Sequence, residues 1–328
     1  MPLTTDEKML TLSREAIEVI DKVDRGIHPG FRPAHAKGIL LTGVFTPSSE
    51  AASLTRAPHI HRSSTPVTVR FSDGGGMPTV ADNDAQNASP RGCAIRFHLA
   101  EHTHTDIVGH SVDTFPSRTA EGLIDFFKAV MATDPAGPHP NAIERFLSTH
   151  PAALAFVQAP KPIPTSFARE SFFAVSAFKF TNADGVSRYG RYRVLPVAGN
   201  EYLDDKAAAP KTPNFLFDEI KERIAKGAIT FRIVVQLAND GDIVDDATVR
   251  WPEDRRRIAF GELSLTAISP DSVGEQQHII FDPVPRVDGI EPSGDPLFEV
   301  RANVYLMSGR RRRAAGKTQA MAGGKVAG

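Results

Sequence analysis

The feature that most constrains the fold is a series of eight segments that are predicted as strands, several of them with alternating apolar and polar residues. Val67, Val69 and Phe71, for example, lie on one side of a predicted strand, whereas Arg70 lies on the other. Strands of this number that pair mostly antiparallel favour a closed barrel, because closure leaves no unpaired edge. We therefore expect an α+β fold built on an eight-stranded antiparallel β-barrel. The predicted strands are 38–47, 67–71, 93–99, 105–115, 170–182, 186–197, 228–238 and 258–268.

Helical patterns flank and interrupt these strands. Apolar residues at helical spacing predict an N-terminal helix over 5–24. A second helix is predicted over 212–227, with Thr212 as its cap, Pro213 at its first position and Gly227 at its end. Between the fourth and fifth strands, a helical insertion is predicted at 119–132, 141–148 and 151–158.

No internal repeat is present, and the pattern predicts a single domain over 1–313. The barrel is expected at about 38–268 and a closing helix at about 295–309. Residues 314–328 are rich in Ala, Gly and Lys, a composition that favours a disordered tail.

The composition excludes several classes of protein. A net charge of −1 and a pI near 6.8 predict no general attraction to nucleic acid or to a membrane surface. Cys93 is the single cysteine, which excludes an intramolecular disulfide and any zinc site based on cysteines, and its alternating surroundings predict a buried thiol. The polar, acidic N-terminus is unlike a signal peptide. We expect a cytoplasmic protein, with a periplasmic location left open if a signal peptide has been removed.

The closing helix carries a pair of residues with a chemical meaning. Asp295 is suited to cap this helix and Pro296 to occupy its first position. Arg301 and Tyr305 are four residues apart and therefore share a face. Tyrosine binds iron as the phenolate, and a neighbouring guanidinium lowers the cost of forming that anion. The same pattern is also typical of an amphipathic helix with a half-buried tyrosine and a solvated arginine.

Three further segments carry polar residues at positions suited to a site inside a barrel. His35, in RPAHAKG, stands at the entrance to the first predicted strand. Ser72, in VRFS, ends the second strand, and its hydroxyl can accept from an imidazole N–H and fix the tautomer. His110 is predicted to lie in the middle of the fourth strand, in TDIVGHS.

Taken together and in order, these segments resemble the haem catalase family. RPAHAKG is similar to the motif of the distal histidine, VRFS to the strand of the orienting serine, and PRGCAIRF with DIVG to the next two strands. RWPEDRRR, FDPVPRVDGIEPSGDPL and RANVY match the approach to the proximal tyrosine, so that the resemblance runs from about Gly30 to Arg313. It implies a haem b inside an antiparallel β-barrel.

Carried over to this chain, the resemblance implies a role for each matching residue. Tyr305 corresponds to the proximal iron ligand, and Arg301 to the cation that stabilises its phenolate. His35 corresponds to the distal acid–base, with Ser72 holding its ring. The residues that correspond to partners of the haem propionates are Arg32, Arg70 and Arg312.

Departures from the family pattern indicate a branch within it. His110 stands where catalases typically have an asparagine that helps to place hydrogen peroxide, and Asn303 replaces a usual aromatic residue. The chain also ends soon after Tyr305, without the C-terminal helical portion of full-size catalases. In these respects it resembles the compact catalase-related peroxidases.

The expected function is reduction of hydrogen peroxide and organic hydroperoxides by a small organic reductant, with weak catalase activity. True catalase activity, rearrangement of fatty-acid hydroperoxides and a haem- or lipid-binding barrel with little catalysis remain alternatives. We expect no nucleic-acid or membrane partner, and a homodimer remains open.

Other motifs have weaker interpretations. HIH at 59–61 and HTH at 102–104 have the spacing of barrel metal sites but lie at predicted strand ends, where a non-haem metal is not favoured. The acidic stretch 240–246 lacks the full calcium-loop pattern, and Gly74–Gly76 lacks the context of a phosphate loop. The arginine run 310–313 is typical of a solvated helix end.

Overall fold

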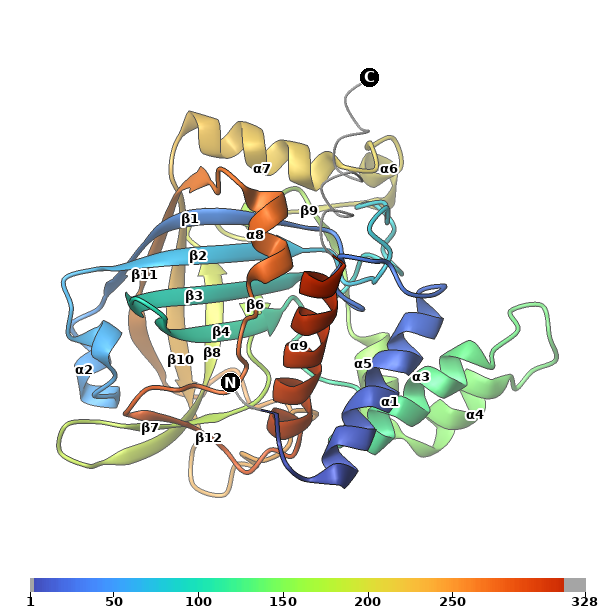
Figure 1. The fold of residues 1–328 in the computed structure, drawn as a ribbon, viewed down its shortest axis with the longest axis horizontal. Helices are drawn as coiled ribbons and strands as arrows, with labels where there is room; N and C mark the ends of the chain where they lie inside the picture. The colour runs from blue at the N-terminus through green and yellow to red at the C-terminus, as the bar shows by residue number, and fades with distance from the viewer. Residues whose placement is uncertain (1–2, 316–328) are drawn as a thin grey trace.

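A closed barrel of eight antiparallel strands forms the centre of the protein, for which a computed structural model describes residues 3–315. The order around the ring is β10-β11-β1-β2-β3-β4-β6-β8, and pairing of β8 with β10 closes it (Figure 1). This confirms the predicted barrel. Its strands are β1 (Gly38–Pro47), β2 (Thr65–Ser72), β3 (Gly92–Ala100), β4 (Thr103–His110), β6 (Phe172–Phe173), β8 (Ser187–Pro196), β10 (Ile229–Leu237) and β11 (Arg257–Ile268).

Aromatic side chains fill the barrel. Phe71, Phe97 and Phe231 are fully buried, and Phe71 is tilted against Phe231 with 5.7 Å between ring centroids. Phe45 meets Phe97 edge to face at 5.0 Å, a favourable arrangement of aromatic quadrupoles. Cys93 is buried in the same core, as its pattern predicts. A core of this kind holds the strands rigidly and so fixes the residues at their ends.

The fourth and fifth predicted strands differ from the prediction. β4 ends at His110 and does not continue to 115, because the Val112 N–H donates to the His110 ring at 3.3 Å and not to a neighbouring strand. His110 is therefore the last residue of its strand. The segment 170–182 divides into β6 and β7 (Phe178–Thr181), and β7 leaves the ring to pair with β12 (Ile290–Pro292). Ser176, between the two parts, turns toward Arg301, which donates to its hydroxyl at 3.4 Å.

The two terminal helices and the helical insertion gather beside the barrel. Figure 1 shows α9 (Leu297–Ala314) between the strands and a group formed by α1 (Glu7–Val23), α3 (Ala120–Met131), α4 (Ala142–Thr149) and α5 (Pro151–Gln158). The smaller elements are α2 (Ala51–Leu54), α6 (Asp205–Ala208), α8 (Ser272–His278), the 3-10 helices Pro58–Ile60 and Phe167–Arg169, and the short pair β5 (Ile163–Pro164) and β9 (Tyr202–Leu203). Within residues 3–315, no helix has both the length and the apolar character needed to cross a membrane.

Helix α7 (Phe215–Lys226) lies across one end of the barrel and begins later than predicted (Figure 1). Thr212 does not cap it; the Leu216 N–H donates instead to the Asp82 carboxylate at 2.7 Å. The cap thus comes from a residue distant in sequence, which local spacing cannot reveal.

The end of α9 is less solvated than predicted. Arg310 and Arg313 are exposed, but Arg311 pairs with Asp21 and Arg312 is buried. Ala314 is the last residue of the helix, and 316–328, most of the predicted tail, lie outside the described residues.

Candidate active site

A row of directly paired residues crosses three strands where the site residues meet. Ser72 on β2 pairs with Gly92 on β3, which pairs with His110 on β4. Opposed residues of neighbouring strands send their side chains to the same face, with about 4.7–4.9 Å between strands. A Cβ on Gly92 would lie 2.6 Å from Ser72 Oγ and 2.8 Å from His35 Nδ1. The His35 ring therefore occupies the space above Gly92, between Ser72 and His110.

The backbone at His35 is held in an unusual conformation. Its φ of 57° lies in the left-handed region, which few residues other than glycine adopt. The N–H groups of His35 and Ala36 donate to the carbonyls of Gly74 and Gly75, each at 3.0 Å. These hydrogen bonds join the loop at 35–36 to the loop at 74–75. They stabilise the backbone conformation of His35 that directs its imidazole over Gly92.

The hydrogen bonds of His35 fix its tautomer. Nδ1 lies 2.9 Å from the Asp73 carbonyl oxygen and 3.2 Å from Ser72 Oγ. A carbonyl can only accept, so Nδ1 carries the hydrogen and Nε2 keeps its lone pair. Burial, together with the charge of Arg70, lowers the pKa of His35 from 6.5 to about 4. His35 is therefore a neutral base at neutral pH, oriented by Asp73 as well as by the predicted Ser72.

His110 has the opposite tautomer. Its Nδ1 accepts from the Val112 N–H, so the hydrogen of the neutral ring is on Nε2. Nε2 is buried and has no hydrogen-bond partner among the described residues. Burial lowers the pKa of His110 from 6.5 to about 3, with a further contribution from His35. His110 is thus a neutral hydrogen-bond donor next to a neutral hydrogen-bond acceptor.

Arg301 and Tyr305 face each other on α9. The guanidinium carbon of Arg301 lies over the Tyr305 ring, 5.9 Å from its centroid. Among the described residues the Tyr305 hydroxyl has no hydrogen-bond partner, and Arg301 donates to the Ser176 hydroxyl. Helix α9 begins at Leu297 with Pro296 in the cap position, one residue later than predicted. Asp295 is therefore not the cap residue, although its carboxylate accepts from the Leu297 N–H at 2.9 Å.

Three arginines from distant segments converge on the end of α8. Arg32 donates to the carbonyls of Gln276 and Ile279 at 3.3 and 3.1 Å, and Arg312 to the same two oxygens at 3.2 and 2.8 Å. Arg70 donates to the Gln276 side chain at 2.8 Å.

No carboxylate among residues 3–315 forms an ion pair with any of these three arginines. Burial and the charge of Arg312 lower the pKa of Arg70 to about 9, and burial and the charge of Arg32 lower the pKa of Arg312 to about 8. Three partly or fully buried cations without a counter-ion form a site that an anionic group would stabilise.

Some contributors to the site are absent from the sequence prediction. The Asp73 carbonyl is a backbone group, so no residue type signals it. Gln276 lies in α8 and Ile279 directly after it, and this seven-residue helix lacks the apolar spacing that predicts helices. Ser176 lies within the strand predicted over 170–182, where nothing in the pattern marks it as a contact of α9.

The other motifs lie apart from this site. His59 is buried among the rings of Phe45, Phe97 and Phe260, whereas His61 is exposed, so HIH does not present two imidazoles together. His102 lies in an exposed turn, while His104 faces His98 across β3 and β4.

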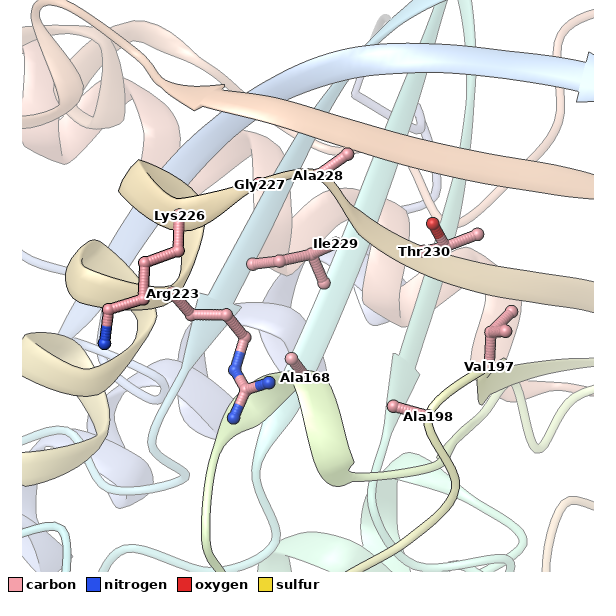
Figure 2. Close-up of a pocket in the computed structure, with 9 residues that line it drawn as sticks. All are labelled: Ala168, Val197, Ala198, Arg223, Lys226, Gly227, Ala228, Ile229 and Thr230. Carbon is pink, nitrogen blue, oxygen red and sulfur yellow. The ribbon is translucent and has the colours of Figure 1, made fainter.

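A surface pocket of about 360 Å³ also lies apart, at the end of α7, and none of the predicted site residues lines it (Figure 2). Its lining consists of Ala168, Val197, Ala198, Arg223, Lys226, Gly227, Ala228, Ile229 and Thr230.

Comparison with known proteins identifies the family. The family described as catalase matches residues 5–321. The chain belongs to the catalase family. This catalase-family chain is 35% identical to the catalase-related peroxidase of Mycolicibacterium paratuberculosis over 294 residues, covering 88% of the chain and 90% of the relative. It is 33% identical to the catalase-related peroxidase of Synechococcus elongatus, covering 88% and 85%.

Full-size catalases are similar over only part of their length. The chain is 27% identical to catalase-2 of Bacillus subtilis, covering 84% of the chain and 42% of that protein. Catalase A of Saccharomyces cerevisiae superposes with a TM-score of 0.74 at 22% identity, covering 95% of the chain and 65% of the yeast chain. A fungal catalase superposes equally well, with 62% of its chain covered.

The family implies a haem cofactor, and the residues of the site fit one. The Tyr305 hydroxyl has no hydrogen-bond partner in residues 3–315, so its oxygen would be available to the iron of a haem. The three arginines without counter-ions suit the two carboxylates of haem. Gly92 leaves room for His35, whose Nε2 is also free of protein hydrogen bonds in the described part of the chain.

Proposed function

We propose that this chain is a haem b peroxidase, which reduces hydrogen peroxide and organic hydroperoxides with electrons from a small organic donor. The observation that carries the proposal is the pair of neutral imidazoles of opposite tautomer beside Gly92, His35 as acceptor and His110 as donor. The two relatives at 35% and 33% identity, both named catalase-related peroxidases, support the same assignment.

In this proposal five residues hold the haem. Tyr305 binds the iron as the phenolate, and the nearby positive charge of Arg301 favours that anion over the neutral phenol. Arg32, Arg70 and Arg312 pair with the propionates, replacing hydrogen bonds to α8 by stronger, charge-assisted ones.

The chemistry divides between the cofactor and the protein. Haem supplies the redox-active iron at which the O–O bond of the peroxide is cleaved. His35 Nε2 takes the proton of the peroxide O–H and returns it to the departing oxygen, which leaves as water or as an alcohol. His110 Nε2–H donates to a peroxide oxygen and orients it. The organic donor supplies two electrons and two protons in all, so that ROOH becomes ROH and water.

The position of His110 bears on the choice between peroxidase and catalase. The pKa of about 3 means that His110 carries no charge at neutral pH, so charge is not what separates it from the usual asparagine. The remaining differences are size and the single direction in which Nε2–H can donate. Turnover of a second hydrogen peroxide demands close positioning of a very small molecule, and a bulky ring at this point favours donor oxidation instead.

The visible spectrum and the two activities test this function. The purified protein should show a Soret band with the high-spin ferric features of phenolate ligation, and Tyr305→Phe should stay soluble and lose the haem. Tyr189→Phe, a change at an exposed tyrosine, is the control. Donor oxidation with an organic hydroperoxide should exceed oxygen evolution from hydrogen peroxide.

Full haem content and an unchanged spectrum in Tyr305→Phe would contradict the ligand assignment. Vigorous oxygen evolution by the parent protein, not increased by His110→Asn, would contradict the proposed role of His110.

A further inference from the structure

A buried acidic side chain lies directly behind the base of the site. Asp73 offers its carbonyl to His35 Nδ1, while its carboxyl group points away from the site and is completely buried. The Asp73 N–H donates to the Lys37 carbonyl at 3.2 Å. Groups that hold the carboxyl group of Asp73 therefore also affect the position of the carbonyl group that accepts from the His35 imidazole.

The carboxyl group of Asp73 lies in a cluster of four charged side chains. Lys37 Nζ lies 3.8 Å and Arg91 Nε 3.7 Å from its two oxygens. Lys37 also makes a shorter contact with the Asp82 carboxylate, which in addition accepts from the Leu216 N–H at the start of α7. Arg91, itself fully buried, donates to the Asp82 carbonyl at 2.6 Å. The charged groups of the cluster come from four separate segments of the chain.

Asp73 lies beside Asp82, because Lys37 Nζ contacts the carboxyl groups of both, at 3.8 Å for Asp73 and more closely for Asp82. Neither of its carboxyl oxygens accepts a hydrogen bond from an N–H group of the described residues, and its neighbour is the Asp82 carboxyl. Two carboxyl groups form a hydrogen bond only when one is protonated. Burial and the negative charge of Asp82 raise the pKa of Asp73 to about 8, while Arg91 and Lys37 oppose the rise. The pair thus holds one proton at neutral pH.

We propose that Asp73 is a positioning residue for His35, and that the proton it shares with Asp82 keeps the orienting carbonyl in place. Loss of this proton puts two carboxylates in contact, and the resulting repulsion moves Asp73 and with it the hydrogen-bond acceptor of His35. The inference rests on the proposed function, in which His35 is the base.

Other charged groups surround the carboxyl groups of Asp73 and Asp82 and influence the loss of their shared proton. Lys37 and Arg91 face Asp73 directly, and Arg70 lies close enough for the two charges to interact. Glu170 lies near Arg91, and burial raises its pKa to about 7. Glu170 therefore gains a charge in a similar pH range. Glu170→Gln removes this titration and shows how much Glu170 contributes to the pH dependence of the reaction rate.

Two substitutions of Asp73 test the proposal. Asn keeps the shape of the side chain, and its amide can donate permanently to Asp82, so Asp73→Asn imitates the protonated pair. Ala removes the anchor altogether. Asp106→Ala is the matched control, because Asp106 is an equally buried carboxylate on β4 that pairs with Arg96 and does not contact His35.

The first measurement is the rate of reaction with peroxide as a function of pH. In the parent protein and in Glu170→Gln the rate should fall as pH rises through about 8. Asp73→Asn should keep the parent rate at neutral pH and lose the alkaline fall. Asp73→Ala should be slower at all pH values, by about tenfold or more, since small displacements of a catalytic group have effects of this size. An alkaline fall retained in Asp73→Asn overturns the proposal.

The second measurement needs no peroxide. Nitrogen NMR of the histidine rings, in the full chain loaded with diamagnetic gallium protoporphyrin, reports the tautomer of His35. We expect Nδ1–H alone in the parent, in Asp73→Asn and in Asp106→Ala, and a mixture in Asp73→Ala. If the parent fails to react with peroxide, the proposed function fails, but the tautomer still tests Asp73. An unchanged tautomer in Asp73→Ala overturns the positioning role.

Discussion

At the scale of single residues, the site depends on which ring nitrogen of each imidazole carries the hydrogen. His35 and His110 are the same residue type and both are neutral, yet a carbonyl at one Nδ1 and an N–H at the other give them opposite roles. Neither role follows from the residue type. The Asp73 carbonyl and the Val112 N–H determine which ring nitrogen carries the hydrogen. Both backbone groups lie just beyond a strand end, so the ends of β2 and β4 set the roles of the two histidines.

Gly92 gives a direct test of this arrangement. Gly92→Ala puts a methyl group within 2.6–2.8 Å of Ser72 Oγ and His35 Nδ1, closer than real Cβ contacts, so the ring must move. We expect haem content to be retained and the rate of reaction with peroxide to fall by about 100-fold, as expected for a displaced catalytic group. Stopped-flow mixing measures this rate.

The control for Gly92→Ala is Gly227→Ala, where an added Cβ meets nothing within 4 Å. If Gly92→Ala reacts as fast as the parent, the His35 ring does not depend on the space above Gly92.

At the scale of elements, the three arginines proposed to bind the propionates meet where α8 and α9 come together. Ile279, the residue that follows α8, accepts from both Arg32 and Arg312, although the two arginines come from opposite ends of the chain. Arg312 thereby holds α9 against α8, and Arg32 attaches the segment before β1 to the same carbonyl group. The carbonyl end of a helix attracts cations, which explains why arginines without counter-ions are tolerated here.

The arginine run at the end of α9 offers a matched pair of substitutions. Arg312→Lys replaces a fork-shaped donor by a single ammonium, and we expect haem to pass to apomyoglobin at least several times faster than from the parent. Arg310→Lys changes an exposed residue two positions away and should leave the transfer rate unchanged. Equal rates for the two variants would mean that Arg312 does not hold a propionate.

At the scale of the whole molecule, the sequence predicts those features that depend on the periodicity of apolar residues or on long motifs. The eight-stranded barrel, the closing helix and the contact of Ser72 with the His35 ring follow from such patterns. The division of the strand at 170–182 does not, because it depends on contacts of Ser176 with α9. The hydrogen bond from His35 to Asp73 is equally hidden, since a backbone carbonyl has no residue type.

The buried histidines predict how the whole protein responds to acid. Burial lowers the pKa of His59 from 6.5 to about 3, although this residue lies among phenylalanines and outside the site. A group whose pKa is lowered by folding contributes stability above its unfolded pKa and loses it as pH falls toward its folded pKa. His59 should therefore destabilise the protein progressively between pH 6.5 and about 3.

His59→Leu removes this titration while keeping an apolar side chain of similar size. We expect the free energy of unfolding, measured with urea at several pH values, to fall less steeply below pH 6.5, by the equivalent of up to about one bound proton. His61→Leu, at an exposed neighbour, is the control and should leave the slope unchanged. A slope in His59→Leu identical to that of the parent would show that His59 is already charged in the folded protein, and that the aromatic cage around it admits water.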